Sequence, residues 1–278
     1  MSKFQSPRPE YDLPPVIEVV LSLQFEPLSE LAAPQFGLLW SQFRNEFPRI
    51  EEHLPIAPVI ETFDVPPKDR LGMRVEMSEV PLLPRMWFLN AAGTELIQVQ
   101  RDRFIHNWRK TDLDQTYPRY EYIRERFRSE LSVFTQFLTS EGINKFAINQ
   151  VEVTYINHIA AGDVWHDHSE LHKVISPWPA SYSDTFLTQI EDGNILMRYR
   201  IADDAGAPIG RLNVELQSGY RKSDHVPIFV LNLTARGKPQ GKGIEGAFSF
   251  LDIGREWIVR GFTSITTQEM HRIWRRTS

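Results

Sequence analysis

One pattern occurs twice in this sequence and constrains the fold more than any other feature: an alternating strand opens each half, and a long amphipathic helix closes it. Residues 16–25 place apolar side chains on one face and Glu18 on the other, which is typical of a half-buried strand. Residues 150–159 align with this strand so that Glu152 falls on Glu18. The alignment predicts a tandem duplication.

The two closing helices are predicted from apolar side chains spaced three and four residues apart. The first covers residues 117–140 and ends near Gly142, and the second covers residues 245–274. Gly254 and Gly261 lie seven positions apart on the buried stripe of the second helix. Small residues at these positions would let the helix lie close against a sheet.

Between these landmarks, the sequence predicts short helices at 34–47 and 168–175, and strands elsewhere. The strands are expected near residues 56–64, 71–78, 85–90, 95–108, 185–190, 195–201, 209–217 and 226–235. Each half then follows the order β-α-β(3-4)-α. The predicted fold class is therefore α+β, with tandem repeats that form a mostly antiparallel sheet with helices on one face.

The expected organisation is an extended segment at 1–15, a first repeat at 16–142 and a second at 143–278, the two repeats forming one continuous unit. With 278 residues the chain can bury a large core, and the absence of cysteine excludes thiol catalysis and Cys-ligated metals. No apolar run approaches the roughly 20 residues that span a bilayer, and the polar start lacks a signal segment. We therefore expect a cytoplasmic protein that does not bind membranes.

If helices cover one sheet face, the opposite face is a polar floor of arginines, acids and amides. By strand alternation, Arg200, Arg211 and Glu215 lie on this floor. Glu18 and Glu152 are expected to be neighbours near its centre, compensated by Arg200 and Arg211. In folds of related topology such a floor binds the ligand, whereas the alternative is a sheet face that simply contacts solvent.

The densest polar and aromatic segment is residues 98–110, which contains Arg103, Asn107, Trp108 and Arg109. Such a mixture could stack a base or hold a peptide. The alternative is a strand that ends in a loop, with its tryptophan packed over the following helix.

Two further motifs are weak. Residues 241–246 match G-x-G-x-x-G before a helix, but no second parallel strand follows, so no dinucleotide site is predicted. His166, His168 and His172 match no established zinc pattern, so we expect neither a metal nor a cofactor. No Ser-His-Asp elbow or Walker loop is visible, which leaves enzymatic activity without a supporting motif.

A resemblance extends over nearly the whole chain. It is carried by Tyr11-x-Leu13-Pro14-Pro15-Val16-Ile17-Glu18-Val19, the run 98–109 ending in Asn107-Trp108-Arg109, Tyr117-Pro118-x-Tyr120, and Phe262-x-x-Ile265-Thr266 with Trp274. In this combination the sequence resembles a sporadically distributed family of uncharacterised bacterial proteins. The resemblance implies no activity or catalytic residue. A patchy distribution implies a mobile-element, toxin–antitoxin or phage-defence context.

Three functions stay open at this point. The first is a non-enzymatic binding protein that recognises a partner protein or peptide through the polar floor or an Asn107-Trp108-Arg109 loop. The second is a ligand-binding or hydrolytic enzyme centred on Glu18 and Glu152, because two close carboxylates can share a proton or hold a cation. The third is nucleic-acid binding through the basic segments 101–128 and 236–278, which the net charge of −5 disfavours.

Overall fold

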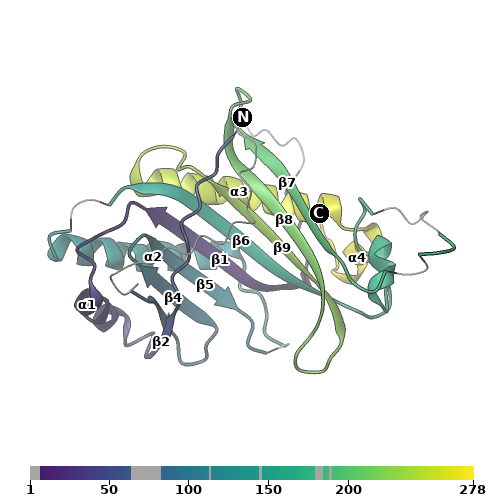
Figure 1. The fold of residues 1–278 in the computed structure, drawn as a ribbon, viewed down its shortest axis with the longest axis horizontal. Helices are drawn as coiled ribbons and strands as arrows, with labels where there is room; N and C mark the ends of the chain where they lie inside the picture. Colours follow the sequence, from purple (N-terminus) through teal and green to yellow (C-terminus); the bar gives the residue numbers. More distant parts are fainter. Residues whose placement is uncertain (1–6, 64–82, 113, 144–145, 179–183, 188–189) are drawn as a thin grey trace. The chain divides into compact units, whose positions relative to one another are not determined.

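The computed structural model describes residues 7–63, 83–112, 114–143, 146–178, 184–187 and 190–278 (Figure 1). In chain order the elements are β1 (Val16–Phe25), α1 (Ala33–Phe43), β2 (Arg49–His53), β3 (Arg85–Leu89), β4 (Glu95–Gln100), β5 (Arg103–Arg109), α2 (Tyr120–Ser140), β6 (Ile148–Ala160), the 3₁₀ helix η1 (His168–Lys173), β7 (Asn194–Ala202), β8 (Pro208–Tyr220), β9 (Pro227–Gly237), α3 (Gly243–Ile265) and α4 (Gln268–Ile273). The predicted α+β class is confirmed.

The strands form a nine-stranded antiparallel sheet in the order β2-β3-β4-β5-β1-β6-β9-β8-β7. In this order β1 lies beside the last strand of its own half, β5, and β6 lies beside the last strand of its half, β9. A repeated β-α-β(3-4)-α unit would give this arrangement, but the tandem duplication itself stays a prediction.

The chain divides into two compact units, which are described separately. Unit 1 comprises residues 1–19, 152–236 and 250–278, and unit 2 comprises residues 20–151 and 237–249. Both units therefore combine segments that are distant in sequence.

In unit 2, α2 covers one face of the sheet with aromatic side chains. Phe104 of β5 stacks on Phe134 with ring centroids 4.6 Å apart, and Phe25 of β1 contacts Phe134 at 5.9 Å. Phe127, two helical turns before Phe134 on the same stripe, is also fully buried. The helix predicted at 117–140 is confirmed, and its apolar stripe faces the sheet as the spacing indicated.

In unit 1, α3 approaches the sheet closely because two glycines face it. A Cβ atom added at Gly254 would lie 2.6 Å from Cγ1 of Val153, and one added at Gly261 would lie 2.9 Å from Cδ2 of Leu212. Real Cβ atoms do not approach other atoms this closely, so larger residues would force the helix away. The expectation that small residues bring this helix close to a sheet is confirmed.

The helix predicted at 245–274 is two helices, because the chain is capped anew at Thr267. The Thr267 side chain accepts a hydrogen bond from the N–H of Met270 at the start of α4, and its hydroxyl donates to the Lys173 carbonyl at 2.6 Å. Threonine hydroxyls compete in this way with helical backbone bonds and favour caps over helix interiors.

Several predicted strands also differ from the structure. Residues 95–108 form the hairpin β4–β5, with a turn at 101–102, rather than one strand. Residues 184–187 and 190 are not in a strand, and the strand predicted at 71–78 lies outside the described residues. The helix expected at 168–175 is the shorter 3₁₀ turn η1.

The described part of the N-terminal segment runs beside the C-terminal residues of unit 1. The N–H of Asp12 donates to the Arg275 carbonyl at 3.1 Å, and the N–H of Thr277 donates to the Glu10 carbonyl at 2.9 Å. No helix in the described part of the chain is long and apolar enough to cross a membrane.

Candidate functional site

One sheet face of unit 2 carries polar side chains that are almost completely buried. They come from β1, β4, β5 and β6, and each exposes 5% or less of its surface: Gln24, Gln98, Gln100, Arg103, Asn107 and Gln150. We call this set the amide face.

Strand alternation and register bring these residues to one side of the sheet. Gln100 lies opposite Arg103, and Gln98 lies opposite Ile105, next to Asn107 along β5. The alternate positions, such as Phe104, point to the face covered by α2. The amide face is therefore the side of the sheet opposite this helix.

Burying an amide without a hydrogen-bond partner costs about 1–3 kcal/mol, so the amide face needs partners within the protein. Some of them lie on the strands of the sheet itself. Nε2 of Gln98 donates to Oδ1 of Asn107 at 2.7 Å, and Nε2 of Gln24 donates to Oδ1 of Asn149 at 3.0 Å. Oε1 of Gln98 is buried without a hydrogen-bond partner among the described residues, whereas several other groups of the amide face bind another part of the chain.

That part is residues 54–63, an extended segment without regular secondary structure, which we call the strap. Gln100 binds both backbone groups of one strap residue, Ile56. Its Oε1 accepts from the Ile56 N–H at 2.9 Å, and its Nε2 donates to the Ile56 carbonyl at 2.8 Å. A neighbouring antiparallel strand supplies the same pair of bonds with its backbone.

Further along the strap, other amide-face residues bind its backbone in the same way. Oε1 of Gln24 accepts from the Val59 N–H at 2.9 Å, and Nη2 of Arg103 donates to the Ala57 carbonyl at 2.9 Å. Oε1 of Gln150 accepts from the Glu61 N–H at 3.3 Å. Side chains from four strands thus do what a paired strand would do.

The prediction of a strand at 56–64 is wrong over the described residues 56–63, which belong to the strap. Pro55 and Pro58 have no N–H to donate to a ladder, and proline keeps the backbone extended. Two apolar residues of the strap are also largely exposed, with 86% of the surface of Leu54 and 49% of that of Ile60 accessible. The segment is therefore extended like a strand, but its backbone bonds go to side chains.

An aromatic and cationic cluster lies on the same side of the sheet, since Trp87 of β3 is opposite Gln98 of β4. The ring of His53 stacks on Trp87 at 3.8 Å between centroids. The guanidinium carbons of Arg85 and Arg109 lie 5.5 and 5.9 Å from the centroid of Trp87. A cation positioned above the face of an indole ring is attracted to it.

The central segment predicted to hold a base or peptide is therefore split between two faces. Asn107 and Arg103 belong to the amide face, and Arg109 lies beside Trp87. Trp108 is 3% exposed and contacts Tyr117, with ring centroids 5.4 Å apart. The expected Asn107-Trp108-Arg109 loop is wrong, because these residues are the end of β5.

In unit 1, the partner of Glu152 is a residue that the sequence analysis missed. Nε of Arg236 on β9 donates to Oε2 of Glu152 at 2.5 Å, and both side chains are 18% exposed. Arg200 and Arg211, the predicted partners, lie directly opposite each other on β7 and β8.

The remaining predicted floor residues also lie in unit 1. Glu215 is exposed on β8, opposite Leu196 of β7, and Glu18 is half-buried on β1. Glu18 has polar partners of its own.

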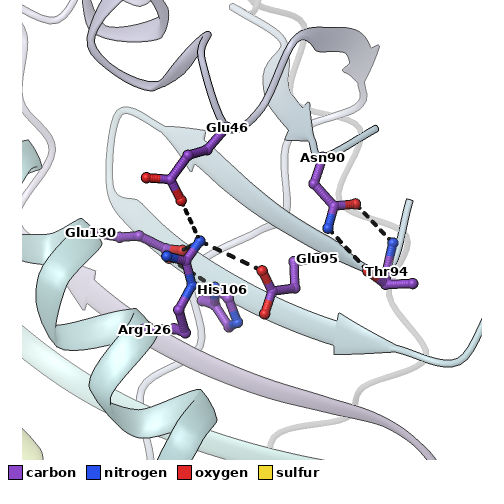
Figure 2. Close-up of polar contacts among 7 residues, drawn as sticks. All are labelled: Glu46, Asn90, Thr94, Glu95, His106, Arg126 and Glu130. Carbon is purple, nitrogen blue, oxygen red and sulfur yellow. Dashed lines mark hydrogen bonds and ion pairs between the residues drawn. The ribbon is translucent and has the colours of Figure 1, made fainter. Parts of the chain in front are cut away.

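On the opposite face of the unit 2 sheet, under α2, a second polar cluster surrounds Arg126 (Figure 2). Nη2 of Arg126 lies 2.8 Å from Glu46 and 3.5 and 3.6 Å from Glu95 and Glu130. Nδ1 of His106 lies 2.7 Å from Oε2 of Glu130. Since His106 is 0% exposed and Glu130 is 4% exposed, this pair lies in the interior and supports α2 against β5.

The histidine and glycine motifs have structural roles. Nε2 of His168 lies 3.1 Å from the carbonyl oxygens of Gly219 and Ile228. No group of three or more His, Asp or Glu residues within the described ranges could hold a metal ion.

In the glycine-rich run, a Cβ atom on Gly246 would clash with the backbone of Gly241, so these glycines permit a tight turn before α3.

Sequence reasoning missed Gln24, Gln100 and Gln150 as site residues. Strand alternation places Gln24 opposite the apolar side chains of residues 16–25, but a glutamine at such a position is usually solvated. The sequence does contain one relevant feature, which is the density of glutamines on strands that also carry apolar side chains on both faces. Comparison with known proteins adds no residue role, because no protein-family model and no curated protein matches the chain.

Proposed function

We propose that this protein is a non-enzymatic binding protein that holds an extended peptide segment of a partner on its amide face. The observation that carries the proposal is the strap: the amide face already binds a peptide backbone, through Gln24, Gln100, Arg103 and Gln150. A surface that binds one extended backbone in this way has the chemistry to bind another.

The mode of recognition resembles strand addition, with one difference. Strand addition uses the free backbone edge of a sheet, whereas the amide face uses side chains in the middle of a sheet. Each bond contributes about 0.5–1.5 kcal/mol net, and all of them go to backbone groups of the bound segment. Affinity would therefore depend on an extended backbone with N–H groups at fixed positions.

The resemblance to a sporadically distributed bacterial family adds a context to this proposal. A peptide-binding protein in a toxin–antitoxin or phage-defence system would recognise an exposed segment of a partner protein. Such a partner need not be folded around the segment, because backbone recognition requires only an extended stretch of chain.

The test is selection of peptides from a random library on the purified protein, followed by affinity measurements on variants. We expect Gln100→Leu to weaken binding of the selected peptides at least tenfold, because it removes a donor and an acceptor. All proteins compared here carry Ile56→Pro and Val59→Pro in the strap, so that the strap does not compete for the amide face. The matched control is Gln217→Leu, which changes an exposed glutamine on β8 of unit 1 and should leave affinity unchanged. Equal affinities for all three proteins would refute the proposed site.

A further inference from the structure

We infer that the strap is a built-in pseudo-ligand, and that the partner's peptide carries the strap's own pattern, Pro-aliphatic-x-Pro-aliphatic-x-Glu. This inference rests on the proposed function. It adds which peptides the amide face accepts and how the free protein keeps that face covered.

The pattern follows from which backbone groups the amide face uses. N–H groups are used at Ile56, Val59 and Glu61, so a ligand needs a residue other than proline at these positions. Pro55 and Pro58 occupy positions where no N–H is needed. Proline there reduces the conformational freedom that an unbound peptide loses on binding.

Side-chain burial along the strap completes the pattern. Ile56 and Val59 are half-buried, which favours aliphatic residues at these two positions. The side chain at the last position, Glu61, is 5% exposed. Ala57 and Ile60 are exposed, so these two positions accept any residue that permits an extended backbone.

The strap is suited to be displaced. Its bonds to the amide face come from side chains, so lifting it leaves the backbone ladder between β4 and β5 intact. Segments with few buried apolar contacts open at low free-energy cost. Because the strap is tethered beside its site, its effective concentration is high, and a free peptide must compete with it.

The experiment uses a labelled peptide with the sequence of residues 53–63 and the full chain as the receptor. The variant Ile56→Pro/Val59→Pro removes two N–H donors from the strap. We expect this variant to bind the labelled peptide at least tenfold more tightly than the unchanged protein, measured by fluorescence anisotropy. The control is Ala57→Pro, which adds a proline where the amide face uses only the carbonyl, and should leave the affinity unchanged.

Two further arms identify the site. Adding Gln100→Leu to the double variant should reverse the gain in affinity, and a peptide carrying proline in place of Ile56 and Val59 should not bind. Equal peptide affinity in the double variant and the unchanged protein, or a gain that survives Gln100→Leu, would overturn the inference.

Hydrogen exchange on the unchanged protein covers the case in which the double variant does not fold. Excess peptide should then speed up exchange at residues 54–63, because it releases the strap, and unaltered exchange at saturating peptide would overturn the inference. The proposed function fails separately. If library peptides bind in a manner dependent on Gln100 but lack the pattern, the pseudo-ligand inference is wrong and the peptide-binding function stands.

Discussion

Each unit contains a histidine whose side chain is almost completely buried, and the two side chains have different polar partners. In unit 2, His106 is 0% exposed and pairs with the carboxylate of Glu130. In unit 1, His271 is 2% exposed and its Nε2 lies 2.8 Å from the hydroxyl of Thr266. That hydroxyl donates to the Phe262 carbonyl, so Nε2 of His271 must be the donor in this contact.

The contrast extends to the packing around each histidine. The interior of unit 2 contains an ion-pair network under α2 and an amide face under the strap, whereas α3 of unit 1 packs through glycines. The charged pair Glu152–Arg236 of unit 1 is partly solvated, at 18% exposure for each side chain. Replacing a polar side chain should therefore destabilise unit 2 strongly and unit 1 only slightly. Adding side-chain volume to α3 should destabilise unit 1.

The largest effect is expected for Glu130→Ala in unit 2. Removing one member of a buried pair leaves its partners desolvated, which destabilises by roughly 3–5 kcal/mol. Urea unfolding would measure the loss. The control is Glu125→Ala on the same helix, where the carboxylate is 64% exposed and its pair with Arg124 is worth about 0–1 kcal/mol. A similar loss for both variants would remove the contrast between buried and exposed carboxylates.

Gly254→Ala in unit 1 should destabilise by about 1–3 kcal/mol, because the new methyl group would overlap Val153. Gly37→Ala is the matched control in α1, where a Cβ atom meets nothing within 4 Å. This control should gain up to about 1 kcal/mol from helix propensity. If Gly254→Ala is also stabilising, α3 can move away from the sheet, and close packing does not distinguish unit 1.

A smaller effect is expected on the pH dependence of stability. Burial lowers the pKa of His271, and the charge of Arg276 lowers it further, while Glu269 and the Thr263 backbone oppose this shift. The unfolded chain, with a histidine pKa of about 6.5, then binds more protons than the folded protein just below that pH. The contribution of His271 to the stability of the folded protein is therefore complete above about pH 6.5 and is lost as the pH falls.

Replacing His271 with Gln keeps a donor for Thr266 but removes the titration. The free energy of unfolding should then fall less steeply between about pH 7 and pH 5. His166→Gln, at an exposed histidine of the same unit, serves as the control. An unchanged pH profile for the His271 variant would show that this histidine is accessible to protons in the folded state.

The smallest effect is expected for Glu152→Gln, which should change stability by about 0–1 kcal/mol because its pair with Arg236 is partly solvated. Thermal or urea unfolding would measure it. A loss of about 3 kcal/mol or more would show that the pair acts as a buried strut, as in unit 2.

Much of the fold could be predicted because it depends on local periodicity. The alternation of residues 16–25 and the apolar stripe of α2 follow from side-chain directions along a strand and a helix. The break between α3 and α4 was missed, because a threonine cap depends on a distant carbonyl, that of Lys173. Arg236 was missed for a similar reason, since the pairing of a carboxylate depends on which strand lies next to it.

The sequence by itself determined the strands that open the two halves, the long helix α2, the packing of α3 through small residues, and that one sheet side is polar. Only the tertiary structure decided that residues 54–63 lie on the amide face. The physical reason is that Gln24 and Val59, or Gln100 and Ile56, meet through hydrogen bonds between residues far apart in the chain. A side chain that binds a distant backbone group produces no periodic pattern of residues in the sequence. Burial of one face of a helix or strand does produce such a pattern, because residues on that face recur at regular intervals.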